Sequence, residues 1–316
     1  MINQEAAARA ALRQRHVVRR IVQSWRLYVM LILPMAYVII FLYLPLYGVQ
    51  IAFKNFSAAL GISGSPWAGL QHFRTFVQSY QFWSLIRNTI ILNLYELLAL
   101  FPLPVVLALL LNAIRSKLYS RGVQIITYAP HFISTVVVVG IMIMMLDPTG
   151  GLVNQVITLV GGHPVNFLGN PSYFRHVYVW SGAWQTLGYS AIIYLAALAG
   201  VDPALHEAAT VDGASRLARV CYIDLPAVLP VTITLMVLNM GSILSSGFEK
   251  VLLMQNPLNL SVSQVIDTYV YQVGLRSAIP QFSYAAAIGL FKSIIGLTLL
   301  VLANSLARRV AKQSLF

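Results

Sequence analysis

Apolar residues occur in long stretches along this chain of 316 residues, separated by short polar segments. A helix needs about 20 consecutive, mostly apolar residues to cross a bilayer. Six stretches are long enough, near Leu27–Phe53, Leu85–Leu111, Gly122–Leu146, Val177–Ala199, Ala227–Ser246 and Tyr284–Leu306. Since a backbone in lipid must satisfy its hydrogen bonds internally, the pattern predicts an all-α polytopic membrane protein with six transmembrane helices.

Basic residues mark one set of the connecting segments. They gather in the N-terminal segment, the second and fourth connections and the C-terminal tail: Arg9, Arg13, Arg15, Arg19, Arg20, Arg26, Arg115, Lys117, Arg121, Arg216, Arg219, Arg308, Arg309 and Lys312. Loops on the cytoplasmic side carry an excess of Lys and Arg. The distribution therefore predicts that both termini are cytoplasmic, which agrees with an even number of spans.

This topology divides the chain into four sections. We expect a basic cytoplasmic tail at 1–26, the first transmembrane helix with a periplasmic loop at 27–84, a transmembrane core at 85–306 and a cytoplasmic tail at 307–316. The core includes a cytoplasmic loop at 200–226, which is the fourth connection.

Composition supports the membrane interpretation. Mean hydropathy is +0.75 and only 9% of residues are charged, whereas soluble chains carry about a quarter. The net charge of +12 would suggest nucleic-acid binding in a soluble protein. Here the basic residues lie between apolar stretches without interleaved aromatic residues, so we expect no nucleic-acid partner. The single cysteine, Cys221, excludes an intrachain disulfide.

The 200–226 loop contains its own helix signals. Asp202 can cap a helix that starts at a proline, which predicts a short helix over Pro203–Val211. An Asp-Gly turn at Gly213 follows, and a second short helix is predicted over Ala214–Tyr222. The alanines and the charge of Glu207 suit a docking knob for a partner protein. An amphipathic hairpin lying on the membrane fits these features equally well.

A sequence motif in this loop resembles a known family. The run Glu207-Ala208-Ala209-x-x-Asp212-Gly213-Ala214, followed by Ile223-x-Leu225-Pro226, resembles the EAA motif of membrane subunits of binding-protein-dependent ABC importers. The resemblance extends over roughly residues 85–306 and implies a type I importer permease fold. In that family the motif forms a coupling helix in a cleft of the ATP-binding subunit. It implies that these residues couple to the ATPase: Glu207, Ala208, Ala209, Asp212, Gly213, Ala214, Leu225 and Pro226.

The resemblance also implies the partners. It implies a permease in the bacterial inner membrane that forms half of a translocation pathway, together with a second homologous permease, two ATP-binding subunits and an extracytoplasmic sugar-binding protein. ATP and Mg would be bound by the ATPase subunits, and no cofactor by this chain. The sequence itself has no Walker-type phosphate loop and no cluster of residues with metal-ligand spacing, so we expect neither enzymatic activity nor a metal.

Four further segments narrow the resemblance to the LplB-like permease group. They are residues 128–135, 148–154, 247–257 and 267–275. That group is associated with oligosaccharides and polysaccharide fragments, so the resemblance implies such a cargo. Alginate-derived or pectin-derived oligosaccharides are examples between which the sequence does not choose.

Ionisable residues inside or beside the predicted spans are candidates for a cargo path. Glu96 lies within the second span, where a charge is costly unless it faces protein or water. Lys292 in the sixth span either pairs with an acid such as Glu96 or extends toward the membrane surface. Glu249 and Lys250, just outside the fifth span, either meet cargo or form a solvated charge pair at a helix end.

Aromatic residues in the fourth span are a second group of candidates. Trp184, Tyr189 and Tyr194 follow near-helical spacing, and aromatic faces can stack on sugar rings, although core packing explains them as well. His131 is interpreted as a packing histidine. The alternative functions are an ion-coupled secondary transporter, which Glu96 and Lys292 alone would favour, and a membrane-embedded enzyme, for which no converging catalytic group is present.

Overall fold

Helices make up the regular secondary structure of the part of the chain that the computed structural model describes, residues 24–114, 116–241, 243–245 and 247–311, apart from one isolated β-bridge. The predicted all-α class is confirmed. The chain divides into two units, Met1–Ala68 and Gly69–Phe316. Much of the predicted basic tail at 1–26, Arg115, Ser246 and the end of the predicted tail at 307–316 lie outside the described residues.

The first unit is one long apolar helix and a short loop. The helix has no break between its α-helical, π-helical and 3-10 parts, which are α2 (Trp25–Val38), η1 (Ile39–Tyr43) and η2 (Leu44–Phe53); α3 (Gly61–Gly64) follows. Lys54 fastens the loop, because its ammonium donates to the Ile62 carbonyl at 2.7 Å and lies 5.0 Å from the centre of the Trp67 ring. A nearly buried charge thereby gains both a hydrogen bond and a cation–π contact.

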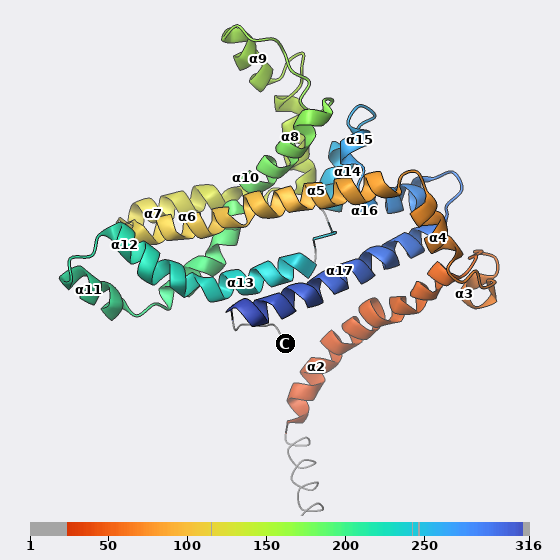
Figure 1. Ribbon diagram of the computed structural model, residues 1–316, viewed down its shortest axis with the longest axis horizontal. Helices are drawn as coiled ribbons and strands as arrows, with labels where there is room; N and C mark the ends of the chain where they lie inside the picture. Colours follow the sequence, from red (N-terminus) through yellow and green to blue (C-terminus); the bar gives the residue numbers. More distant parts are fainter. Residues whose placement is uncertain (1–23, 115, 242, 246, 312–316) are drawn as a thin grey trace, which may run out of the picture. The chain divides into compact units, whose positions relative to one another are not determined.

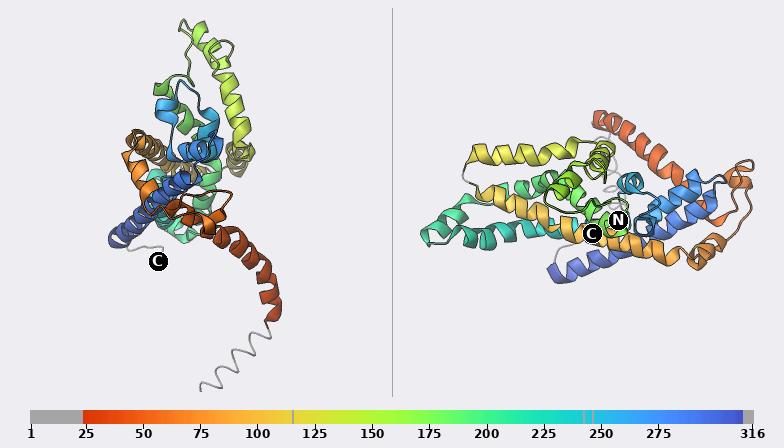
Figure 2. Two further views of the ribbon diagram at one scale, coloured as in Figure 1. Left: turned by 90° about the vertical axis from the view of Figure 1, so that its right-hand side faces the viewer. Right: turned by 90° about the horizontal axis from the view of Figure 1, so that it is seen from above.

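The second unit contains the remaining elements (Figure 1). They are α4 (Gln71–Gln78), α5 (Phe82–Leu100), α6 (Pro102–Ala113), α7 (Lys117–Tyr128), η3 (Ala129–Phe132), α8 (Thr135–Met145), α9 (Leu152–Leu159), α10 (Pro171–Ala199), α11 (Pro203–Val211), α12 (Arg216–Arg219), η4 (Val220–Asp224), α13 (Leu225–Gly241), α14 (Phe248–Met254), α15 (Leu260–Ser263), α16 (Ile266–Tyr271), η5 (Gln272–Arg276) and α17 (Phe282–Ala311). Within this unit, α4 and α11 lie at opposite ends of the long helices, and Figure 2 shows the same separation from above.

The described residues contain four helices long and apolar enough to cross a membrane: Trp25–Phe53, Phe82–Ala113, Arg216–Gly241 and Phe282–Arg308. Two further helix pairs qualify only if each bent pair counts as one span, which gives up to six. One pair bends by 98° between η3 and α8, and the other by 73° between α10 and α11. At the first bend Pro130 lies in η3 and Ser134 caps the start of α8. Each bend therefore coincides with a new helix start.

The predicted second short helix over Ala214–Tyr222 is wrong as a separate element. After the turn at Gly213 the chain enters a helix at Arg216 that continues through η4 into α13. The Ser215 hydroxyl caps this helix by accepting from the Ala218 N–H. Pro226 lies in the first turn of α13, directly after the π-helical segment η4, and the helix continues through it. The loop thus carries one free-standing helix, α11.

Helix α10 is the central element of the second unit. It packs against α5, α6, α7 and α13. Its residues belong to two of the three hydrophobic clusters, one formed with α5, α8 and α14 and the other with α6 and α13. At Gly188 a side-chain carbon would approach the Thr127 carbonyl oxygen to 2.2 Å, so glycine permits the close contact with α7. The third cluster joins α4, α5, α16 and α17.

Candidate functional site

Local interactions define both ends of α11. The Asp202 carboxylate accepts from the Ala204 N–H at 2.9 Å, which confirms the predicted helix start. At the other end the Ala214 N–H donates to the Ala209 carbonyl at 2.8 Å across Gly213, whose φ is +78°. This is the Schellman ending that favours glycine. The spacing of the EAA motif therefore ends the helix at a fixed point.

The outward face of α11 mixes one charge with apolar groups. Glu207 and Ala208 are exposed, and Leu205 and Val211 are 54% and 87% exposed. Large exposed apolar side chains next to a single carboxylate are typical of a protein-binding surface. Ala209 and Ala214 are half-buried on the inner side, and Asp212 and Gly213 form the exposed turn. Leu225 and Pro226, the other predicted motif residues, are exposed at the start of α13.

A pocket of about 550 Å³ opens between α5, α6, α10 and α13. We call it the α10 pocket. Among the predicted cargo-path residues, Glu96, Tyr189 and Tyr194 line it, whereas Trp184, which is 52% exposed, does not. Sequence reasoning missed its other polar lining residues, which are Asn93, Thr186, Ser190, Asn239 and Ser245.

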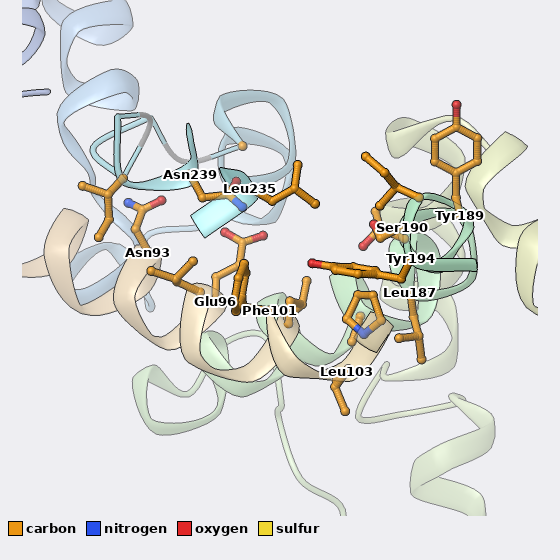
Figure 3. A pocket seen from close by; sticks show the side chains of 18 of the residues that line it. Asn93, Glu96, Phe101, Leu103, Leu187, Tyr189, Ser190, Tyr194, Leu235 and Asn239 are labelled. Atoms are coloured by element: carbon orange, nitrogen blue, oxygen red, sulfur yellow. The ribbon is translucent and has the colours of Figure 1, made fainter. Parts of the chain in front are cut away.

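The polar lining falls into two groups. Figure 3 shows Asn93, Glu96 and Asn239 at one end of the α10 pocket and Ser190 and Tyr194 at the other. Asn93 and Glu96 are three residues apart on α5, so helical spacing from Glu96 was a signal for Asn93. No comparable signal identified Asn239, because nothing in the sequence relates α13 to α5. The pocket offers amide, hydroxyl and carboxylate groups beside aromatic rings.

Lys250 is buried, so the interpretation of Glu249 and Lys250 as a solvated charge pair is wrong. The Lys250 side chain is 8% exposed, and its ammonium donates to the Tyr178 carbonyl at 2.9 Å. The Tyr178 hydroxyl donates to the Glu96 carboxylate at 3.5 Å and accepts from the Gly247 N–H at 3.2 Å. This group joins α5, α10 and α14 behind the α10 pocket. Glu249 is exposed.

Lys292 does not pair with Glu96, and it does not extend freely toward the membrane surface. Its ammonium forms an ion pair with Asp267 of α16, and both side chains are largely shielded. The pair lines a separate pocket between α14, α16, η5 and α17. Lys250, and not Lys292, is therefore the cation that acts on Glu96. The predicted residues Lys292 and Glu96 belong to different sites.

The aromatic candidates differ in their surroundings. The Tyr189 ring stacks on His131 with 3.8 Å between ring centres, so one face is already covered and His131 is a packing residue. Tyr194 is 3% exposed and belongs to the cluster of α6, α10 and α13 while also lining the α10 pocket. Among the described residues, no group of three or more His, Cys, Asp and Glu side chains could hold a metal ion.

The capped helix α11 and its EAA-like motif agree with the protein family that the sequence matches. Residues 100–312 match the profile of the binding-protein-dependent transport system inner membrane component. This chain belongs to that family. It is thus a permease component of an ABC importer and not an enzyme, and membership gives no support to the alternative of an ion-coupled secondary transporter.

Two relatives from Bacillus subtilis (strain 168) resemble this permease over nearly its whole length. The polygalacturonan/rhamnogalacturonan transport system permease protein YteP is 41% identical over 96% of this chain and 94% of its own. Protein LplB is 42% identical over 92% of this chain and 91% of its own. The resemblance to LplB-like permeases is confirmed.

Two solved structures share the fold. One is the crystal structure of a bacterial ABC transporter involved in the import of the acidic polysaccharide alginate, with a TM-score of 0.86, 39% identity, and coverage of 93% of this chain and 99% of that one. The other is the bacterial alginate ABC transporter in complex with an alginate pentasaccharide-bound periplasmic protein, with the same TM-score and identity and coverage of 94% and 99%. The type I importer permease fold is therefore shown.

Proposed function

We propose that this permease forms half of the pathway of an importer for oligosaccharides or polysaccharide fragments. The observation that carries the cargo class is the near full-length similarity to a polygalacturonan/rhamnogalacturonan permease and to an alginate importer. Both names describe polymers rich in acidic sugars, so uronate-containing oligosaccharides are the first cargoes to test. A second homologous permease, two ATP-binding subunits that hold ATP and Mg, and an extracytoplasmic sugar-binding protein complete the importer.

The α11 helix is the proposed contact with an ATP-binding subunit. Its motif, its exposed Glu207 and the apolar side chains of Leu205 and Val211 support this role. The basic segments that predict orientation put α11 on the cytoplasmic side of the bacterial inner membrane, with six spans and both termini inside. The ATP-binding subunit would then contact a helix whose two ends are fixed by Asp202 and Gly213.

The α10 pocket is the proposed part of the cargo path. Its volume is in the range of small-ligand sites, and its polar groups can hydrogen-bond sugar hydroxyls. Tyr194 supplies an aromatic ring at the end of the pocket opposite Glu96 and Asn93. Trp184, Glu249 and Lys292 lie outside this pocket, so we propose no cargo contact for them. Lys250 contributes through its charge, which attracts Glu96, and through its bond to Tyr178.

The proposed mechanism is a two-state cycle. ATP binding draws the ATP-binding subunits together and moves α11, which biases the permease pair toward the state that receives cargo from the binding protein. Hydrolysis returns the pair to the other state. Coupling of this kind requires only that ATP and cargo each favour a different one of the two states.

Co-purification tests the proposal. The permease is expressed with its neighbouring genes, isolated by a tag on this chain, and assayed for ATPase activity with a binding protein loaded with alginate or galacturonan oligosaccharides. We expect ATP-binding subunits to co-elute and loaded binding protein to stimulate hydrolysis. A permease that purifies without any ATP-binding subunit, or an ATPase that no oligosaccharide-loaded binding protein stimulates, contradicts the proposal.

Charge reversal at Glu207 tests the α11 contact within the same assay. The Glu207→Arg permease should still insert in the membrane but lose the ATP-binding subunits, because an exposed carboxylate facing a cationic partner becomes a like charge. Glu249→Arg is the matched control, since Glu249 is also exposed but lies on α14. Equal recovery of ATP-binding subunits by both variants would remove Glu207 from the contact.

A further inference from the structure

Two side-chain contacts join α11 to the helix that follows it. His206 Nε2 lies 3.3 Å from Asp224 Oδ1, and Arg219 Nη1 donates to Thr210 Oγ1 at 2.9 Å. His206 and Thr210 are four residues apart, so both point from the same face of α11. The exposed residue Glu207 between them faces elsewhere. The side of α11 away from the proposed ATPase contact is thus attached to residues 216–241.

Asp224 also contacts a third element. The Asn112 side-chain amide at the end of α6 donates to the same Asp224 Oδ1 at 3.2 Å. Asp224 is 3% exposed and is the last residue of the π-helical segment η4, directly before α13. We call Asp224, His206 and Asn112 the Asp224 junction. One buried carboxylate oxygen therefore links α11, α6 and the start of α13.

Because Asp224 is buried, its carboxylate depends on the hydrogen bonds of this junction. A carboxylate shielded from water is costly unless hydrogen-bond donors surround it, and the loss of one partner costs more than at the surface. A displacement of α11 that separated His206 from Asp224 would incur this cost. Moving α6 and α13 together with α11 avoids it. The contacts at Asp224 thus favour a concerted movement of the three elements.

The junction lies next to the packing between α6, α10 and α13. Val228, one helical turn after Asp224, is fully buried in the cluster that also contains Ala108 of α6 and Tyr194 of α10. Tyr194 in turn lines the α10 pocket. A close-packed cluster transmits displacement because its side chains leave little free space. Continuous contacts thus run from α11 through Asp224 to the pocket.

We propose that Asp224 is a positioning residue that makes α11, the end of α6 and the start of α13 move as one unit, so that displacement of α11 reaches the α10 pocket. This rests on the proposed function of α11 as the contact with the ATP-binding subunit. A residue that only stabilised α11 would need no bond to α6, whereas Asp224 Oδ1 contacts both His206 of α11 and Asn112 of α6.

The test measures cargo transported per ATP hydrolysed. The complete importer with the Asp224→Ala permease is reconstituted in proteoliposomes, with a binding protein loaded with the alginate or galacturonan oligosaccharide that stimulates the wild type. We expect ATP-binding subunits to remain bound and to hydrolyse ATP, while uptake per ATP falls about tenfold, in the range of coupling between sites. Asp147→Asn, a carboxylate change in the turn before α9, is the control and should leave this ratio unchanged.

Two further variants separate positioning from general stability. His206→Ala should lower the transport-to-hydrolysis ratio, and His206→Gln, which keeps a side-chain N–H donor, should restore most of it. The double variant Asp224→Ala/His206→Ala should lose no more than Asp224→Ala, because both changes remove the same contact. These His206 variants keep the proposal testable if Asp224→Ala fails to assemble, since the His206 side chain is 29% exposed.

The outcomes distinguish this proposal from the proposed function. If the wild-type importer shows no stimulated hydrolysis or uptake, the proposed function is overturned. The positioning role of Asp224, which rests on that function, is then overturned as well. If the wild type transports and Asp224→Ala or His206→Ala transports as much per ATP, only the positioning role of Asp224 is overturned. A lower amount of cargo transported per ATP in His206→Ala, with recovery in His206→Gln, supports the positioning role of Asp224.

Discussion

The 200–226 loop and the α10 pocket are built in opposite ways. In the loop, Asp202, Gly213 and Ser215 set the helix ends through bonds to residues two to five positions away. In the pocket, Glu96 acquires its partners Tyr178 and Lys250 from α10 and α14, and the bond between those two joins residues 72 positions apart. The helix ends in the loop are therefore set locally, whereas the pocket depends on the packing of the whole second unit.

The difference matters for transport because each design suits its proposed task. A helix that contacts another subunit must keep its shape when that subunit moves, and local caps provide this. A cargo path must change shape, and side chains from several helices can separate without unfolding any of them. Substitutions should consequently act on coupling in the loop and on stability in the pocket.

The largest expected effect is at Gly213. Its φ of +78° is closed to proline, whose ring fixes φ near −65°, so Gly213→Pro should displace the end of α11 and abolish uptake while the permease still inserts. Gly213→Asn is the control, because asparagine tolerates this backbone region, and it should keep most of the activity. Oligosaccharide uptake in proteoliposomes is the measurement, and full uptake by Gly213→Pro would show that the turn does not set the coupling geometry.

A smaller effect is expected behind the α10 pocket. Lys250→Met removes a charged donor from the buried Tyr178 carbonyl, so it should destabilise the permease by roughly 2–3 kcal/mol. Adding Glu96→Gln should recover part of the lost stability, because glutamine carries no charge and needs no nearby cation. Thermal unfolding in detergent measures both. Independent, additive losses in the double variant would mean that Lys250 and Glu96 do not interact.

The smallest effect is expected at the pair outside this pocket. Asp267→Asn keeps a side-chain oxygen that can accept from Lys292 and removes only the negative charge, so the loss of stability should be about 1 kcal/mol. Uptake should stay within about twofold of the wild type, because neither Asp267 nor Lys292 lines the α10 pocket. If Lys292→Gln abolished uptake without lowering the unfolding temperature, Lys292 would regain a role in the cargo path.

The sequence by itself determined the class of the protein and the position of its EAA-like motif. Long apolar stretches leave only helices as membrane-spanning structures, and the helix over Pro203–Val211 is confirmed at both ends because its caps lie within the loop. Local sequence signals did not predict where the next helix ends, because that helix continues past Tyr222. The run after Gly213 has no terminating residue before α13, so the predicted separate helix is the beginning of a longer one.

Only the tertiary structure decided which charged and polar groups meet. Lys292 is 25 residues from its partner Asp267, and Asp224 joins Asn112 from a distance of 112 residues. No periodicity specifies such pairs, because which helix faces reach each other depends on how the helices pack and bend. The sequence shows which charged residues lie in or beside the apolar stretches, but the packing around α10 brought Lys250 near Glu96 and separated Lys292 from both.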